Sequence, residues 1–203
     1  MRREDWLNSV KELIEKEVFG RLGYVIPPVR LSCGWPSARG LSKNNRRVGE
    51  CWAAEASFDK VHEIFISPYL EDRVEVAATV MHELVHAIAG VQEKHGRAFK
   101  KVCTRIGLIG PVTNTLPSPG LREFLEKLVD RVGPYEHASI DAIMSDRKKQ
   151  TTRMIKLECE YCGYTVRTTM KWLGYGLPRC VCEHDFKVAD GGVKKEDEKA
   201  ATP

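Results

Sequence analysis

Four stretches of the chain place apolar residues at helical spacing, with charged residues between them. This pattern predicts amphipathic helices, because residues three or four apart fall on one helix face. Gly20 and Gly90 are expected to end the first and second helices, and either Ser67-Pro68 or Asp72 opens the second. The predicted helices cover residues 5–19, 67 or 72 to 90, 97–106 and 121–132.

Three shorter runs are typical of β-strands. They cover residues 29–32, 51–58 (CWAAEASF) and 61–67 (VHEIFIS). Asp59-Lys60 separates the last two runs, which predicts a hairpin. Strands followed by a block of helices indicate an α+β fold.

The hydrophobic pattern also suggests where the chain divides. The polar, basic stretch SDRKKQTTR at residues 145–153 has the composition of a linker. A compact unit with paired cysteines follows it, and the last residues, GGVKKEDEKAATP, are typical of a disordered end. We therefore predict a domain at 1–140, a basic linker at 141–156, a small unit at 157–188 and a tail at 189–203.

Composition agrees with a soluble protein of one ordinary domain plus an appendage. The chain has 203 residues, of which 42% are hydrophobic and 30% charged. A net charge of +4 permits a nucleic-acid partner without requiring one. The N-terminal MRREDWLNSV has no apolar stretch that would serve as a signal peptide. The apolar stretch 74–91 is interrupted by charged residues and histidines, which excludes a transmembrane helix.

We therefore expect a cytoplasmic monomer that does not bind membranes. In that reducing compartment, the seven cysteines are expected to be metal ligands or buried thiols instead of disulfides. Cys33, Cys51 and Cys103 are interpreted as ordinary thiols.

The segment MHELVHAIAGVQEKHGRAFK at residues 81–100 carries the strongest chemical signal. Its H-E-x-x-H motif places His82 and His86 on one helix face, where both imidazoles can bind one ion. Zinc in catalytic sites takes three protein ligands and keeps a fourth position for water. Glu83 is placed to take the proton of that water and return it to a leaving amine.

The H-E-x-x-H motif alone does not identify the third ligand. His95 is favoured because Gly96 allows unusual backbone geometry and Phe99 can anchor the following helix in the core. The competing candidates are Glu93 in the turn and Glu123 or Glu126 on a later helix.

The run H-E-L-V-H…H-G-R-A-F resembles the SprT-like and Spartan metalloproteases, whose pattern is H-E-x-x-H, a variable turn, and H-G-x-x-F. The resemblance covers residues 60–106 well and the N-terminal third only in outline. It implies a zincin-like protease domain in which His82, His86 and His95 bind the catalytic zinc and Glu83 is the catalytic base.

A second metal site is predicted near the C-terminus. Cys159-x-x-Cys162 and Cys180-x-Cys182 supply four thiolates, a set that suits a closed structural zinc site in a small β zinc ribbon. Because the second pair is C-x-C and not C-x-x-C, His184 is an alternative to one of the cysteines. SprT-like proteins often carry such a ribbon after the protease domain, so the resemblance implies the same arrangement here.

The ribbon and its linker also suggest a nucleic-acid partner. Eight basic and three acidic residues lie between Ser145 and Cys182, interleaved with four aromatic residues. Cations that neutralise phosphates beside rings that stack on bases make a DNA-binding face. The alternative is a solvated surface whose aromatics pack the ribbon core. The candidate contacts are Arg147, Lys148, Lys149, Arg153, Arg167, Lys171 and Trp172.

Together these features predict a zinc-dependent endopeptidase with one catalytic and one structural zinc ion, in which Glu83 activates a zinc-bound water. The resemblance implies protein substrates that are bound or crosslinked to DNA, as in DNA–protein crosslink repair. The alternatives are another cytoplasmic zincin that cuts a regulatory protein, and a non-catalytic DNA-binding ribbon protein. Two minor candidates are a basic patch on the loop 39–47, and His137 with Tyr135 as donors to an oxyanion.

Overall fold

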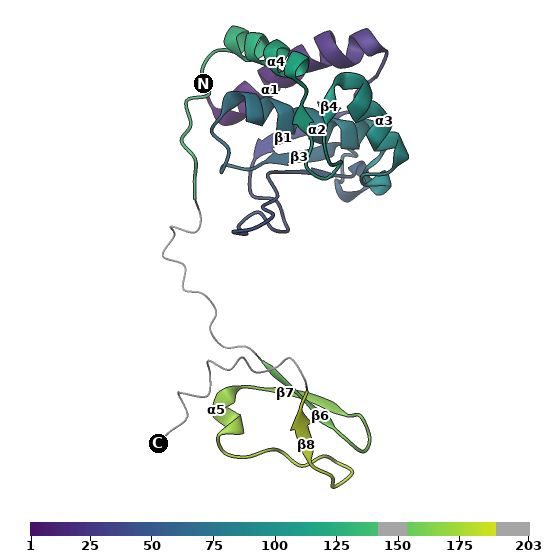
Figure 1. The fold of residues 1–203 in the computed structure, drawn as a ribbon, viewed down its shortest axis with the longest axis vertical. Coiled ribbons are helices and arrows are strands. Elements are labelled where there is room, and N and C mark those ends of the chain that lie inside the picture. Colours follow the sequence, from purple (N-terminus) through teal and green to yellow (C-terminus); the bar gives the residue numbers. More distant parts are fainter. Residues whose placement is uncertain (142–153, 190–203) are drawn as a thin grey trace. The chain divides into compact units, whose positions relative to one another are not determined.

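The computed structural model describes residues 1–141 and 154–189, and the chain divides into two compact units, residues 1–145 and 146–203 (Figure 1). The first unit mixes helices with short sheets. Its helices are α1 (Arg3–Ile14), α2 (Arg73–Ala89), α3 (Arg97–Ile106) and α4 (Pro119–Val132), and its strands are β1 (Val29–Cys33), β2 (Gly49–Trp52), β3 (His62–Ile66), β4 (Leu108–Ile109) and β5 (Leu116–Pro117).

The main sheet has the strand order β1-β3-β2. The central strand β3 pairs in parallel with β1 and antiparallel with β2, so Ile64 lies between Leu31 and Cys51. All three side chains are buried, which fixes the register by the face that each strand presents to the core.

The predicted hairpin between the second and third strands is confirmed, but the extent predicted for its first strand was wrong. Strand β2 ends at Trp52, and Ala54–Ala56 form a 3-10 turn. The sequence Ala-Glu-Ala is poor in β-branched and aromatic residues, so it does not extend the strand. The strand also begins two residues before the predicted run, at Gly49.

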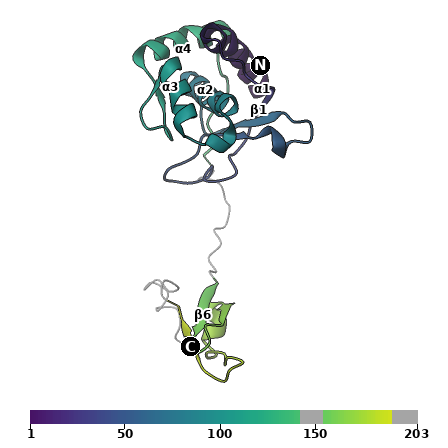
Figure 2. The same cartoon turned by 90° about the vertical axis from the view of Figure 1, so that its right-hand side faces the viewer.

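Helix α2 is the centre of the first unit. It begins at Asp72, whose carboxylate accepts hydrogen bonds from the N–H groups of Val74 (3.0 Å) and Glu75 (2.8 Å), as expected of an N-cap. It ends at Gly90, in agreement with the sequence. Figure 2 shows α2 flanked by α1, α3 and α4, and it also contacts strand β2. Its fully buried residues include Val76, Ala77, Val80, Met81, Leu84 and Val85.

The outer helices are held to this centre by apolar faces and a few polar contacts. Helix α1 continues as a π-helical turn (Glu15–Phe19) and a 3-10 turn (Gly20–Leu22), which confirms the predicted helix and lengthens it. The indole N–H of Trp6 donates to the Gly133 carbonyl at 3.1 Å and ties α1 to the end of α4.

None of the helices in residues 1–141 and 154–189 is long and apolar enough to cross a membrane.

The second unit has its own sheet and its own core. Strands β6 (Ile155–Cys159), β7 (Thr165–Thr168) and β8 (Phe186–Val188) form an antiparallel sheet of order β7-β6-β8, with a short helix α5 (Met170–Leu173). Strand β6 begins two residues before the small unit predicted at 157–188. The buried residues are Ile155, Leu157, Cys159, Cys180 and Phe186. Most of the predicted linker and all but the first residue of the predicted tail lie outside the described residues.

Candidate metal centres

Three histidines converge at the C-terminal half of α2. His82 and His86 lie one turn apart on the helix, and their ring centroids are 5.2 Å apart. His95 follows a short turn (Val91–Glu93), with its ring centroid 5.5 Å from His82 and 4.8 Å from His86. One nitrogen from each ring lies within 4.8 Å of the others. The structure therefore brings together the three residues predicted as ligands of one ion.

The backbone conformation of the turn after α2 reverses the chain, so that His95 comes back toward this helix. Gly90 has φ 91° and Lys94 has φ 50°, and both values belong to the left-handed region that reverses a chain direction. Of the competing candidates, Glu123 is paired with Lys127 and Glu126 with Arg122 on the exposed surface of α4. Glu93 is exposed at the end of the turn before His95. Among the residues that the structure describes, the group that could hold a metal here contains only the three histidines.

Phe99, the phenylalanine of the H-G-x-x-F pattern, packs against the three histidines. It is fully buried, and its ring centroid lies 5.0 Å from His82, 4.3 Å from His86 and 4.9 Å from His95. One aromatic ring therefore packs against all three imidazoles and restricts how they can turn. The phenylalanine predicted as a core anchor also orients the centre.

The imidazoles are held in the neutral form. Burial lowers the pKa of His82 to about 4 and that of His86 to about 3, and it also lowers the pKa of His95. A neutral ring keeps the lone pair that binds a metal. Three such nitrogens are a donor set that fits zinc in a site with an open position.

Thr115 contacts the same centre, although no sequence pattern points to it. Its hydroxyl lies 2.8 Å from His82 Nδ1, and it reaches there from the turn between β4 and β5. This contact leaves His82 Nε2 as the nitrogen free to bind an ion. Hydrogen bonds of this kind fix the tautomer and orientation of a ligating histidine.

Glu83 lies beside the histidines in a buried position, with 5% of its surface exposed. The pKa of its carboxyl is raised to about 8, mainly by burial; the charge of Arg47 lowers it and the charge of Glu50 raises it by a smaller amount. The start of β2 packs directly on this carboxylate. A Cβ atom added to Gly49 would clash with Glu83 Oε1 and lie 2.8 Å from Thr79 Cγ2, so any larger residue here would have to displace these side chains.

Glu50 fixes the loop that precedes β2. Its carboxylate accepts hydrogen bonds from the N–H and hydroxyl of Ser37 (both 2.8 Å), the indole of Trp52 (3.0 Å) and the guanidinium of Arg47 (2.6 Å). Burial favours the neutral acid, but these hydrogen bonds outweigh it and lower the pKa of Glu50. Because it stays ionised, the carboxylate keeps both Ser37 and Arg47 in place.

The cations of the loop 39–47 do not form one uniform basic patch. Arg46 stacks on the Tyr69 ring, 3.7 Å from its centroid, and pairs with Asp141 at 3.5 Å. Arg47 turns to Glu50 instead. Lys43 is exposed.

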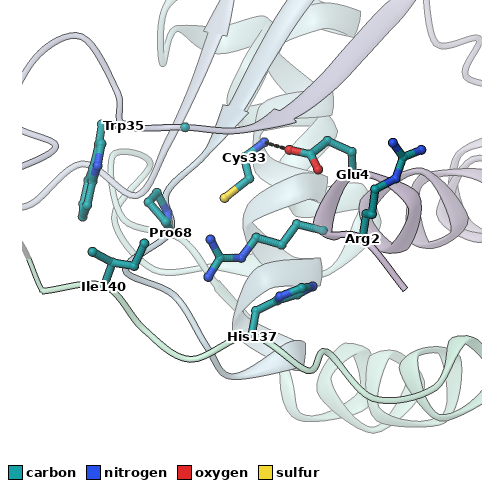
Figure 3. Close-up of a pocket in the computed structure, with 9 residues that line it drawn as sticks. Arg2, Glu4, Cys33, Trp35, Pro68, His137 and Ile140 are labelled. Carbon is teal, nitrogen blue, oxygen red and sulfur yellow. Dashed lines mark hydrogen bonds between the residues drawn. The ribbon is translucent and has the colours of Figure 1, made fainter.

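Tyr135 and His137 contact other residues than the three histidines do. Tyr135 is buried against Trp6, with ring centroids 4.8 Å apart, and His137 packs on Tyr135 at 5.1 Å. His137 lines a cavity of about 550 Å³ together with Cys33 and Trp35 (Figure 3), and no ligand histidine lines it. In residues 1–141 and 154–189 neither residue has a ring contact or hydrogen bond with His82, His86 or His95, so the suggestion that they donate to an oxyanion at the histidine centre gains no support.

The second unit gathers its four paired cysteines. The sulfur atoms of Cys159 and Cys182 are 3.6 Å apart, those of Cys162 and Cys180 3.4 Å, and those of Cys162 and Cys182 3.5 Å. These separations are far longer than a disulfide bond and leave four free thiols around one point. Backbone N–H groups of Cys162 and Tyr161 lower the pKa of the Cys159 thiol, which favours the thiolate that binds metal.

His184 is not part of this cluster. Its Nδ1 atom lies 2.8 Å from the Cys182 carbonyl oxygen, and its ring stacks on Tyr161 at 4.1 Å. The group that could hold a metal in residues 154–189 consists of the four cysteines. Four thiolates in a closed cluster suit a structural zinc site.

The four aromatic residues interleaved with the basic ones are on the surface of the second unit. Tyr161, Tyr164, Trp172 and Tyr175 are 72%, 52%, 61% and 80% exposed, so they do not make up its core. Lys171 Nζ lies 5.4 Å from the Trp172 ring, and Arg167 is exposed on β7. The other predicted nucleic-acid contacts, Arg147, Lys148, Lys149 and Arg153, lie outside the described residues.

Comparison with known proteins identifies the first unit. A model described as the SprT-like family matches residues 12–118, just over half of the chain. The matched range contains the three histidines, Glu83 and Thr115. No curated protein and no solved structure matches the chain.

Proposed function

Because the chain belongs to the SprT-like family, we propose that it is a zinc-dependent endopeptidase of zincin-like architecture. The observation that carries this proposal is the group of three imidazole nitrogens within 4.8 Å of one another, together with the buried Glu83 on the same helix as two of them. Three histidines and one carboxylate are the parts that hydrolysis of a peptide bond at a metal requires.

A zinc ion bound by His82, His86 and His95 would supply an acidified water and polarise the scissile carbonyl. The chain's own contribution is the movement of a proton. Glu83 accepts the proton released when the water oxygen bonds to the carbonyl carbon, and it then delivers that proton to the amine nitrogen as the C–N bond breaks. Burial raises the pKa of Glu83 in the metal-free chain; the positive charge of a bound zinc ion would lower that pKa again and leave the carboxylate ionised, so that it can take up the proton.

The rival zincin with a glutamate ligand on α4 has less support. Glu123 and Glu126 are both exposed and paired with cations on their own helix. A third histidine is already in place beside the first two.

The cysteine cluster is proposed to hold a second, structural zinc ion. Within residues 154–189 the core of the second unit comprises five buried residues, and two of them are cysteines. A segment with so little apolar core usually depends on its metal for folding.

We further propose that the second unit binds DNA and so directs cleavage to DNA-associated or DNA-crosslinked proteins. The exposed rings of Trp172 and Tyr175 are available to stack on bases, and Lys171 and Arg167 can neutralise phosphates. A protein recruited to DNA in this way would meet substrates that are also bound there.

The direct test is Glu83→Gln in the full chain, with Glu75→Gln as a matched control on the exposed side of the same helix. Zinc stoichiometry and cleavage of a DNA-bound protein are measured for both, with and without DNA. We expect Glu83→Gln to keep its zinc and lose cleavage, and Glu75→Gln to keep both. Cleavage by Glu83→Gln would refute the mechanism. Equal cleavage with and without DNA would remove only the recruitment by DNA.

A non-catalytic ribbon protein is the second candidate, and zinc content separates it from the first. Two zinc ions per chain and DNA-dependent cleavage support the peptidase. A single zinc ion that is lost with Cys159→Ser, with no cleavage, would favour a DNA-binding protein whose H-E-x-x-H helix is structural.

A further inference from the structure

The two faces of helix α3 carry opposite chemistry. Its apolar face is buried in the first unit and consists of Phe99, Val102, Cys103 and Ile106. The opposite face is exposed, and its residues recur at helical spacing. They line a shallow groove of about 380 Å³ and are named the basic stripe: Arg97, Lys100, Lys101, Thr104 and Arg105.

The positive charge of the basic stripe is not neutralised by its own surroundings. The segment 94–122 contains no Asp or Glu, and its basic residues are Lys94, Arg97, Lys100, Lys101, Arg105 and Arg122. Within residues 1–141 and 154–189, no cation of the stripe forms an ion pair, whereas Lys11, Arg73 and Lys127 on the other helices all do. The stripe therefore offers its charge to a partner.

The composition of the stripe fits the backbone of duplex DNA better than a protein or a single strand. Protein–protein interfaces centre on aromatic residues and are depleted in lysine, whereas the stripe has two lysines and no apolar residue. Single strands are held by stacking on exposed rings, but Tyr24, 5.5 Å from the Arg105 guanidinium, packs on the core. Duplex DNA carries one charge per about 1.7 Å of its axis. Arg97 and Arg105 are separated by about 12 Å along the helix, so the stripe can meet several phosphates.

The buried face of α3 connects the stripe to the histidine centre. Helix α3 packs on α2 (Figure 2), and Phe99 contacts all three imidazoles, with ring centroids 4.3 to 5.0 Å away. Arg97 follows His95 by two residues. DNA on the stripe would therefore be separated from the imidazoles by the thickness of one helix, roughly 10 Å, and would leave the centre open.

We infer that the basic stripe binds the phosphate backbone of duplex DNA and gives the first unit its own contact with DNA beside the histidine centre. Contacts to phosphates carry no sequence information, so the stripe holds any duplex alike. A protein attached to that DNA is then kept within reach of the centre, a consequence that rests on the proposed function. The contact is separate from the one proposed for the second unit, because it uses cations and no stacking ring.

The experiment compares Lys100→Gln/Lys101→Gln in the full chain with Lys43→Gln/Lys60→Gln, which removes two exposed cations from loops of the same unit. The anisotropy of a fluorescein-labelled DNA duplex gives the affinity at a series of salt concentrations. The slope of log affinity against log salt should become shallower by about 1 for each stripe lysine lost, so by about 2 in the first variant, on duplexes of any sequence. The control variant should keep the wild-type slope. Circular dichroism and zinc content check that both variants fold.

Equal slopes in the two variants would overturn the stripe as a DNA site. The same measurement with labelled single-stranded DNA, an RNA duplex and polyglutamate identifies the partner, and Lys100→Gln/Lys101→Gln should lose most affinity for duplex DNA. An equal or larger loss with any of the other three probes would overturn the choice of duplex DNA. A chain that binds duplex DNA through the stripe and cleaves no protein would contradict the proposed function and leave the stripe standing.

Discussion

Replacing Glu83 by glutamine should stabilise the metal-free protein at neutral pH. The carboxyl is 5% exposed, and burial raises its pKa to about 8 from an ordinary value of 4.5. In the unfolded chain the group ionises freely in water, whereas in the folded chain it holds its proton. Glutamine has nearly the same shape as the protonated acid and never ionises, so the substitution removes only the cost of burying the charge.

The sign and size of the effect follow from this difference in pKa. A group whose pKa is higher in the folded state favours folding below pH 4.5, and that advantage is lost as the pH rises toward 8. Each unit of difference is worth 1.36 kcal/mol, so the gap between Glu83→Gln and the wild type should be about 3 kcal/mol at pH 7. It should level off at about 5 kcal/mol above pH 8 and vanish below pH 4.5.

Urea unfolding of the chelator-treated full chain, followed by circular dichroism between pH 4 and pH 9, measures this gap. The lowered pKa values of His82 and His86 also make stability depend on pH, but both proteins share them and the difference cancels them. Glu75→Gln, on the exposed side of α2, should follow the wild type. If Glu83→Gln and the wild type keep a constant difference across this range, the buried carboxyl does not carry the pKa assigned to it.

Four other predictions test the two centres. Replacing His95 by alanine should remove one equivalent of zinc and all cleavage, whereas His137→Ala should remove neither; retained zinc in the first variant would exclude His95 as a ligand. Gly49→Ala should displace the Glu83 carboxylate, so cleavage falls while zinc content stays at the wild-type value, and an active variant would contradict the close packing of β2. Thr115→Val should lower the affinity of the histidine centre for zinc about tenfold, as measured by chelator competition; no change would mean that the hydrogen bond to His82 is unimportant. Cys182→Ser should release the second equivalent of zinc and open the second unit to limited proteolysis, and a protected fragment would show that this unit folds without metal.

The parts of the fold and site that could be predicted are those that local periodicity determines. His82, Glu83 and His86 are related by one helical turn, so their positions follow once the helix is recognised. The resemblance to SprT-like proteases is confirmed by the family match, and it supplied His95 across a turn whose geometry the sequence alone did not decide. The spacing of the four cysteines was enough to predict that they form one cluster.

The parts that could not be predicted depend on contacts between distant segments. Thr115 reaches His82 from a turn thirty-three residues away, and no pattern marks it as different from other threonines. The same holds for Gly49, whose contact with Glu83 arises only when β2 pairs with β3 and packs on α2. For His184 the sequence predicted more than the structure shows. Its spacing made it a possible metal ligand, but its ring stacks on Tyr161 and its Nδ1 atom contacts the Cys182 carbonyl, so it is not part of the cysteine cluster.

The two clusters differ in the element that would hold the metal, since one offers only nitrogen and the other only sulfur. Peroxides oxidise thiolates readily and leave neutral imidazoles untouched, so oxidative stress attacks the cysteine cluster first. Acid instead affects the histidine cluster, because protons compete with a metal for the imidazole lone pairs. The chain therefore has two separate chemical vulnerabilities, and mild oxidation would release a metal bound by the cysteines while a metal bound by the histidines would stay.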